Sequence, residues 1–211
     1  MKKQIIFSLV MLWGFLLVGC TAEKPPQSQE THAPDGAVSQ NSETPPPVQK
    51  GSLGKVEISF PFARQAGVAS NQFAVWIEDK EGTLVKTLFV TDFTAQGGYH
   101  SRKEALAAWV QRSNPAGAPA GDIDEVSGAT PPSGNLTYTW DCADQNGNPV
   151  SGGEYRFFVE GTLFWESNVL YSGTIAVGET QESPVTATAE YSSEDEKNKD
   201  MIGPVEAVYL P

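Results

Sequence analysis

The residues with the most distinctive chemical pattern form one short segment, Asp124-Glu125-Val126-Ser127-Gly128-Ala129-Thr130. Its last residue carries a hydroxyl group, and the two residues before it have almost no side chain. Gly128 and Ala129 would let a modifying enzyme approach the backbone closely, while Pro131-Pro132 disfavours a helix and keeps the chain extended. The pattern predicts a presented hydroxyl that can accept a covalent group. We call residues 124–130 the acceptor heptad.

The acceptor heptad resembles the sites at which bacterial flavin transferases attach FMN. Their pattern is Asp, any two residues, Ser or Thr, Gly, Ala, and Ser or Thr, and every fixed position is filled here, by Asp124, Ser127, Gly128, Ala129 and Thr130. The resemblance implies that Thr130 accepts FMN as a phosphodiester when the transferase, aided by a metal ion, cuts the pyrophosphate of FAD. Asp124 would orient the segment or contact the transferase, and the sequence leaves both roles open. The alternative is an unmodified turn leading into the next strand.

The N-terminus has the features of a bacterial secretion signal. A basic start at Lys2-Lys3 precedes an apolar stretch from Ile5 to Val18, and Leu17-Val18-Gly19-Cys20 resembles a lipoprotein lipobox. We expect residues 1–19 to be a signal peptide and Cys20 to carry lipid. That lipid would hold the protein at the extracytoplasmic face of a cell membrane. A simple membrane anchor or an ordinary secreted protein is the alternative.

Composition divides the rest of the chain into three parts. Residues 20–54 are rich in Pro, Ser and Thr and predict a disordered tether. Residues 55–178 hold enough apolar residues for one folded domain, and residues 179–211 are predicted to be an acidic, partly disordered C-terminal segment. A formal net charge of −12 argues against nucleic acid as a partner.

The domain is predicted to be mainly β. Two-residue alternation of apolar and polar side chains predicts strands over residues 56–60, 73–77, 84–90, 136–140, 155–159 and 169–177. Asp79–Gly82 would join the second and third strands in a hairpin. Turn-forming residues from Asp144 to Gly153 would join the fourth strand to the fifth as a second pair.

One helix is predicted to interrupt the strands. Ser101 and Glu104 match a capping box, apolar residues follow at helical spacing, and Asn114-Pro115 should end the helix. Together these elements predict an immunoglobulin-like β-sandwich with one inserted α-helix and a long loop.

Two longer stretches resemble known domains. The run from Thr139 to Tyr155 is similar to the "TWDGxDxxGxPVPxGxY" element of flagellar hook-cap-type Ig-like domains, except that Cys142 stands where glycine is usual. The span from about Val56 to Val177 resembles a family of bacterial periplasmic proteins of predicted Ig-like fold. Members share an "AVWIED" strand, here Ala74–Asp79, and an "SGAT" segment before a "YTWD" strand. Their genes lie near flavin transferases and membrane flavoprotein-like reductases, which implies both enzymes as partners.

Few other residues suggest chemistry. Tyr99, His100 and Trp109 are candidate neighbours of a flavin, or they pack the inserted helix. With two histidines and one cysteine left after lipidation, no metal-ligand cluster and no catalytic constellation is recognisable. Cys142 is expected to be a small buried residue, with a reactive thiol or an intermolecular disulfide as alternatives.

Two functions from different classes follow. In one, FMN on Thr130 makes the protein a carrier of electrons from a membrane reductase, with the redox chemistry supplied by the flavin. In the other, the domain is a non-catalytic Ig-like interaction or structural module without a cofactor, which docks a partner through a sheet edge or through Tyr99–Gln111. An enzyme is the least supported class, because no acid, base or nucleophile is visibly grouped.

Overall fold

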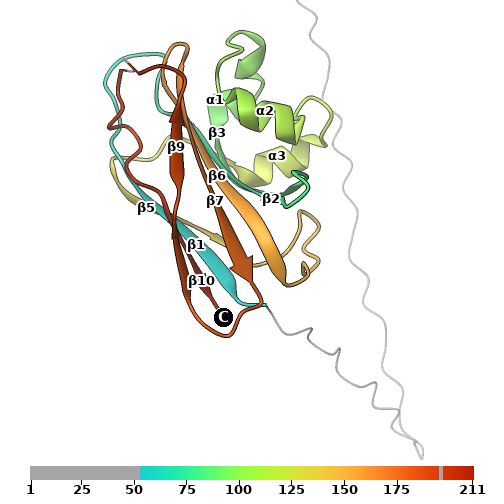
Figure 1. Ribbon diagram of the computed structural model, residues 1–211. Helices are drawn as coiled ribbons and strands as arrows, with labels where there is room; N and C mark the ends of the chain where they lie inside the picture. Colours follow the sequence, from blue (N-terminus) through green and yellow to red (C-terminus); the bar gives the residue numbers. More distant parts are fainter. Residues whose placement is uncertain (1–52, 195–196) are drawn as a thin grey trace, which may run out of the picture. The chain divides into compact units, whose positions relative to one another are not determined.

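Strands dominate the computed structural model, which describes residues 53–194 and 197–211 (Figure 1). The predicted signal peptide, Cys20 and nearly all of the predicted tether lie outside the described residues. The strands form two sheets, one with the order β5-β1-β10-β8 and one with the order β4-β3-β2-β6-β7-β9. The prediction of a mainly β sandwich is therefore confirmed.

The two sheets are built from strands that are far apart in the sequence. The four-stranded sheet contains β1 (Lys55–Phe62), β5 (Gly134–Trp140), β8 (Ser183–Thr186) and β10 (Glu206–Leu210). The six-stranded sheet contains β2 (Gln72–Asp79), β3 (Leu84–Thr91), β4 (Ser127–Gly128), β6 (Gly153–Phe164), β7 (Ser167–Val177) and β9 (Thr188–Tyr191). The pair β3–β4 is parallel, and the other pairs are antiparallel.

The main core lies between the facing sheets. Every second residue of β1 is buried, from Val56 to Phe62, because a two-residue period puts these side chains on one face. Phe73, Val75 and Ile77 of β2 meet them from the other sheet. Burial of each such side chain stabilises the fold by about 1.5–3 kcal/mol. The predicted strands and their inward faces agree with this core.

A second core covers the outer face of the six-stranded sheet. After β3 the chain forms α1 (Asp92–Ala95), the 3-10 helix η1 (Gly98–His100), α2 (Ala107–Ser113) and α3 (Ala120–Val126), which gather on one side of the sandwich (Figure 1). Between the helices and the sheet, the buried side chains of this second core are Ala74, Trp76, Val90, Leu106, Trp109 and Phe158. The Trp76 and Phe158 rings stack with centroids 5.0 Å apart. The middle of β2 is consequently buried on both faces.

The inserted helical region differs from the prediction at its start. Among the described residues it holds three short α-helices instead of one, and the Ser101 hydroxyl bonds the backbone of η1 instead of capping a helix. Two amides in the first turn of α2, on Ala108 and Trp109, donate to the Glu160 carboxylate of β6 at 3.1 and 2.8 Å. A strand residue distant in sequence thus caps α2. The predicted end at Asn114 is confirmed.

The second predicted strand pair is wrong in its pairing. β5 lies beside β1, whereas β6 lies between β2 and β7 in the other sheet. Residues 141–152 therefore carry the chain across the sandwich, which turn-forming residues alone cannot distinguish from a hairpin. Within this crossing Cys142 has φ 55°, in the left-handed region that favours glycine. The backbone therefore takes the shape that the usual glycine would adopt.

The C-terminal segment supplies strands to both sheets. Residues 179–211, expected to be acidic and partly disordered, contain β8, β9 and β10. β10 pairs with β1 inside the four-stranded sheet, and Val205, Ala207 and Tyr209 are buried. The acidic residues of this segment led to the expectation of partial disorder, although the buried residues of β10 alternate with exposed or half-buried ones after them. The strands of the sandwich therefore continue beyond the predicted boundary at residue 178.

Candidate functional site

The acceptor heptad spans a helix end and an edge strand, not a loop. Residues 124–126 form the last turn of α3, and Ser127–Gly128 form β4, which pairs with Val90–Thr91 at the end of β3. Ala129 and Thr130 then leave regular structure, followed by the two prolines. The extended loop that the sequence predicted begins only at Ala129.

Two heptad residues have roles within the fold. The Ser127 hydroxyl donates to the Asp124 carbonyl at 3.3 Å, at the C-terminal end of α3. A Cβ atom at Gly128 would lie 2.9 Å from Cε2 of Phe89, so glycine lets this ring pack against β4. The small residue that sequence reasoning assigned to enzyme access is therefore also needed for packing. The Asp124 side chain is exposed.

Thr130 is held loosely and lies beside a cation. Its half-buried hydroxyl donates to the Asn71 carbonyl at 3.4 Å, which is long for an O–H···O bond. Its carbonyl accepts a hydrogen bond from the Arg64 guanidinium at 3.3 Å. The Arg64 backbone amide also donates to the Ser133 hydroxyl at 2.8 Å. The Arg64 side chain is thus placed next to the candidate acceptor.

The charge around Thr130 suits a phosphate group. Arg64 is exposed, and none of the four ion pairs among the described residues involves it. Guanidinium groups pair strongly with phosphate oxygens. A phosphodiester on Thr130 would therefore lie beside the Arg64 guanidinium, which forms none of these four ion pairs. Sequence reasoning missed Arg64, because the pairing of Phe62 with Gly134 brings its loop to the heptad across a long stretch of chain.

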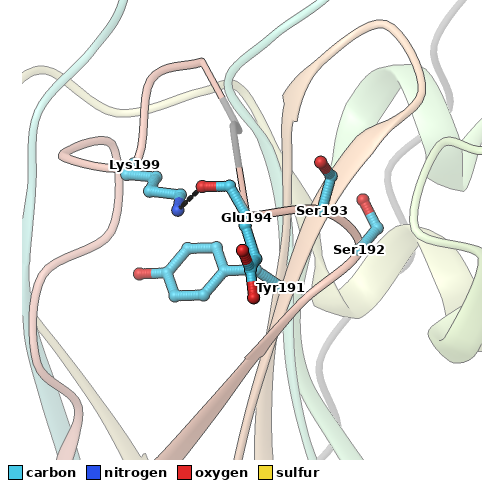
Figure 2. Close-up of a pocket in the computed structure, with 5 residues that line it drawn as sticks. All are labelled: Tyr191, Ser192, Ser193, Glu194 and Lys199. Atoms are coloured by element: carbon cyan, nitrogen blue, oxygen red, sulfur yellow. Dashed lines mark hydrogen bonds between the residues drawn. The ribbon is translucent and has the colours of Figure 1, made fainter.

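One cavity borders the acceptor heptad, and a second lies elsewhere on the domain. One, of about 540 Å³, lies between α3, β3 and the turn at residues 145–147, and Glu125 and Val126 of the heptad line it, but Thr130 does not. The other, of about 400 Å³, lies at the end of β9. Figure 2 shows Lys199 there, donating to the Glu194 carbonyl beside the Tyr191 ring. No heptad residue lines this second cavity.

The sequence around this site matches a known protein family. A family described as predicted periplasmic protein, DUF2271, matches residues 54–194. The chain belongs to the DUF2271 family. Its membership indicates an extracytoplasmic location. No curated protein and no solved structure is significantly similar to the chain. Within residues 53–194 and 197–211, no helix is long and apolar enough to span a membrane.

The other candidate residues of this DUF2271 domain are not among the hydrogen-bond partners of Thr130, which are Arg64 and Asn71. Trp109 is buried and its indole N–H donates to the Thr87 hydroxyl at 3.1 Å, so it packs α2 onto the sheet. Tyr99 and His100 lie in η1 with ring centroids 4.3 Å apart, and His100 is exposed. In the part of the chain that the structure describes, no three His, Cys, Asp or Glu side chains are grouped to hold a metal ion.

Cys142 is buried, as expected for a small packing residue. Desolvation by burial, helped by the charge of Asp141, raises the pKa of its thiol to about 11. The thiol is therefore protonated at neutral pH and poorly nucleophilic.

Two buried carboxylates lie beneath the helices, and sequence reasoning missed both. Burial raises the pKa of Glu160 to about 7, although the amides of Trp109 and Ala108 that it accepts lower it. Glu78 accepts from the Trp76 indole at 2.9 Å and from the Arg112 guanidinium at 3.0 Å. Each carboxylate joins a helix to the sheet.

Proposed function

We propose that this protein is a membrane-anchored extracytoplasmic lipoprotein that carries covalent FMN on Thr130 and transfers electrons through it. The observation that carries the proposal is the setting of the Thr130 hydroxyl. It lies outside regular structure, is half exposed, is held by one long hydrogen bond and lies beside the Arg64 guanidinium. The fixed residues of the acceptor heptad add the resemblance to flavin transferase sites.

The attachment reaction balances with FAD as the donor. The Thr130 oxygen loses its proton and forms a bond to the phosphorus atom of the FMN half, while the pyrophosphate bond breaks and AMP leaves. A flavin transferase catalyses this step. Arg64 then neutralises the phosphodiester anion and holds it near the backbone of Thr130. Once attached, the flavin supplies the redox chemistry, which the protein's own side chains do not.

The location supports the same proposal. The family description is periplasmic, and a lipid on Cys20 would keep the domain near membrane enzymes. Its partners would be the flavin transferase that modifies it and a membrane reductase that supplies electrons. The Asp124 carboxylate, exposed at the end of α3, is available to contact the transferase.

Intact mass after co-expression with a bacterial flavin transferase tests the proposal. The protein should gain the mass of FMN minus water, and Thr130→Ala should abolish the gain. Thr130→Ser should keep it, because a hydroxyl remains. Thr139→Ala is the matched control, since it removes an exposed threonine hydroxyl outside the acceptor heptad and should leave the gain intact. An unchanged mass for the unaltered protein, or flavin retained by Thr130→Ala, contradicts the proposal.

A second function is supported by the roles of Ser127 and Gly128 within the fold. If the heptad serves only to end α3 and to seat Phe89, the domain is a non-catalytic interaction or structural module without a cofactor. That protein would stay colourless after co-expression with the transferase. It would also capture a partner that is lost when an exposed sheet edge is altered.

A further inference from the structure

Large apolar side chains are exposed at one end of the sandwich. Val68, Phe93 and Trp165 are 75%, 43% and 53% exposed, respectively. They lie in the β1–β2 connection, just after β3, and in the β6–β7 turn. Thr130 lies at this end too, because β4 runs parallel to β3 and finishes beside Thr91.

The exposed position of Trp165 is fixed by an unusual backbone arrangement. Trp165 and Ala69 have φ values of 44° and 67°, in the left-handed region that is strained for residues other than glycine. The Trp165 backbone amide donates to the Ala69 carbonyl at 2.8 Å. The Arg102 guanidinium donates to the Ala69 and Trp165 carbonyls at 2.7 and 2.8 Å and lies 5.8 Å from the indole centroid. Three linked hydrogen bonds thus fix the backbone at Trp165, whose side chain is exposed.

A short path of contacts joins Trp165 to Thr130. Ala69 is two residues before Asn71, whose carbonyl accepts the Thr130 hydroxyl at 3.4 Å. Two extended residues and the two hydrogen bonds place the Thr130 hydroxyl oxygen at most about 14 Å from the backbone nitrogen of Trp165. A ribityl phosphate is long and flexible enough to bridge most of this separation.

We propose that Trp165 is the stacking platform for the isoalloxazine ring of FMN carried on Thr130. This inference rests on the proposed function. Offset stacking between aromatic rings is favourable beyond the apolar area that it buries. The Arg102 guanidinium fixes the indole from one side, and more than half of Trp165 remains exposed to meet the ring. A flavin at this end of the sandwich would leave one edge of its ring exposed to an electron-transfer partner.

Two other places for the ring are less suited. Phe93 is less exposed, and its ring packs closely on Gly98, where a Cβ would lie 2.5 Å from Cε1. The cavity under α3 reaches only to Leu88 of β3, about 10 Å along the strand before Thr91, and Thr130 lies beyond that point.

Flavin fluorescence of the modified protein tests the platform. A stacked indole quenches flavin emission, so Trp165→Leu should brighten the protein several-fold and lower the flavin anisotropy. Trp165→Phe should also brighten it but keep the anisotropy high, because a ring remains to stack. Phe93→Leu is the matched control and should change neither signal. Intact mass must show one FMN on each variant, and thermal unfolding must show that each is folded.

The outcomes separate the two proposals. If the unaltered protein carries no FMN, the proposed function fails and the platform with it. If FMN is attached but Trp165→Leu and Trp165→Phe match the unaltered protein in both signals, the platform alone is refuted. The same conclusion follows if Phe93→Leu, and not Trp165→Leu, brightens the flavin emission and lowers its anisotropy.

Discussion

Replacing Glu160 should remove a strong pH dependence from the stability of the fold. Burial raises the pKa of Glu160 from its ordinary 4.5 to about 7, so the folded protein binds this proton more tightly than the unfolded chain. The contribution of this proton to the free energy of unfolding is fully present below about pH 4.5. It is lost as the pH rises through about 7. The difference between those values corresponds to about 3 kcal/mol.

Urea denaturation from pH 5 to pH 8 measures this effect. The free energy of unfolding of the unaltered protein, relative to that of Glu160→Gln, should fall by about 2–3 kcal/mol over the range. The glutamine stays neutral and its carbonyl can still accept one of the two α2 amides. Glu125→Gln, an exposed change on α3, is the control and should follow the unaltered protein. Parallel pH profiles for Glu160→Gln and the unaltered protein would refute the reasoning.

Three further predictions concern packing, charge and the thiol. Gly128→Ala should lower the free energy of unfolding by about 1–3 kcal/mol, because its Cβ would meet Phe89 at 2.9 Å. In urea denaturation Gly121→Ala, with no atom within 4 Å of its Cβ, should be neutral or stabilising, and equal losses for both would disprove the packing role. Arg112→Met should cost about 2–4 kcal/mol, since it leaves the buried Glu78 carboxylate without its counter-ion. Adding Glu78→Gln should recover much of that loss, and no recovery would contradict the assignment. Cys142 should react slowly with iodoacetamide at pH 8 in the folded protein and quickly in urea, and rapid labelling of the folded protein would show that the thiol is not buried.

Strand positions were predictable because burial on one face leaves a direct trace in sequence. Val56, Ile58 and Phe60 alternate as β1 requires, and Asp79–Gly82 closes the hairpin between β2 and β3. The choice of neighbouring strands within each sheet has no comparable pattern in the sequence. The segment between β5 and β6 has the composition of a hairpin turn, yet it crosses from one sheet to the other.

The start of α2 was not predictable for a different physical reason. A capping box at Ser101 is a local signal, but the amides of α2 are capped by Glu160, which reaches them from β6. The acceptor heptad was found from its residue types alone. Its partners Arg64 and Asn71 were not, because only the pairing of β1 with β5 and the loop that follows bring them to Thr130.

Peptide mapping after co-expression with a flavin transferase tests the central claim most directly. Trypsin should release a peptide from Ser113 to Arg156 that contains the whole acceptor heptad. Fragmentation of this peptide should place the mass of FMN minus water on Thr130. An unmodified peptide, or the same mass on Ser127, would contradict the assignment of Thr130 as the flavin acceptor.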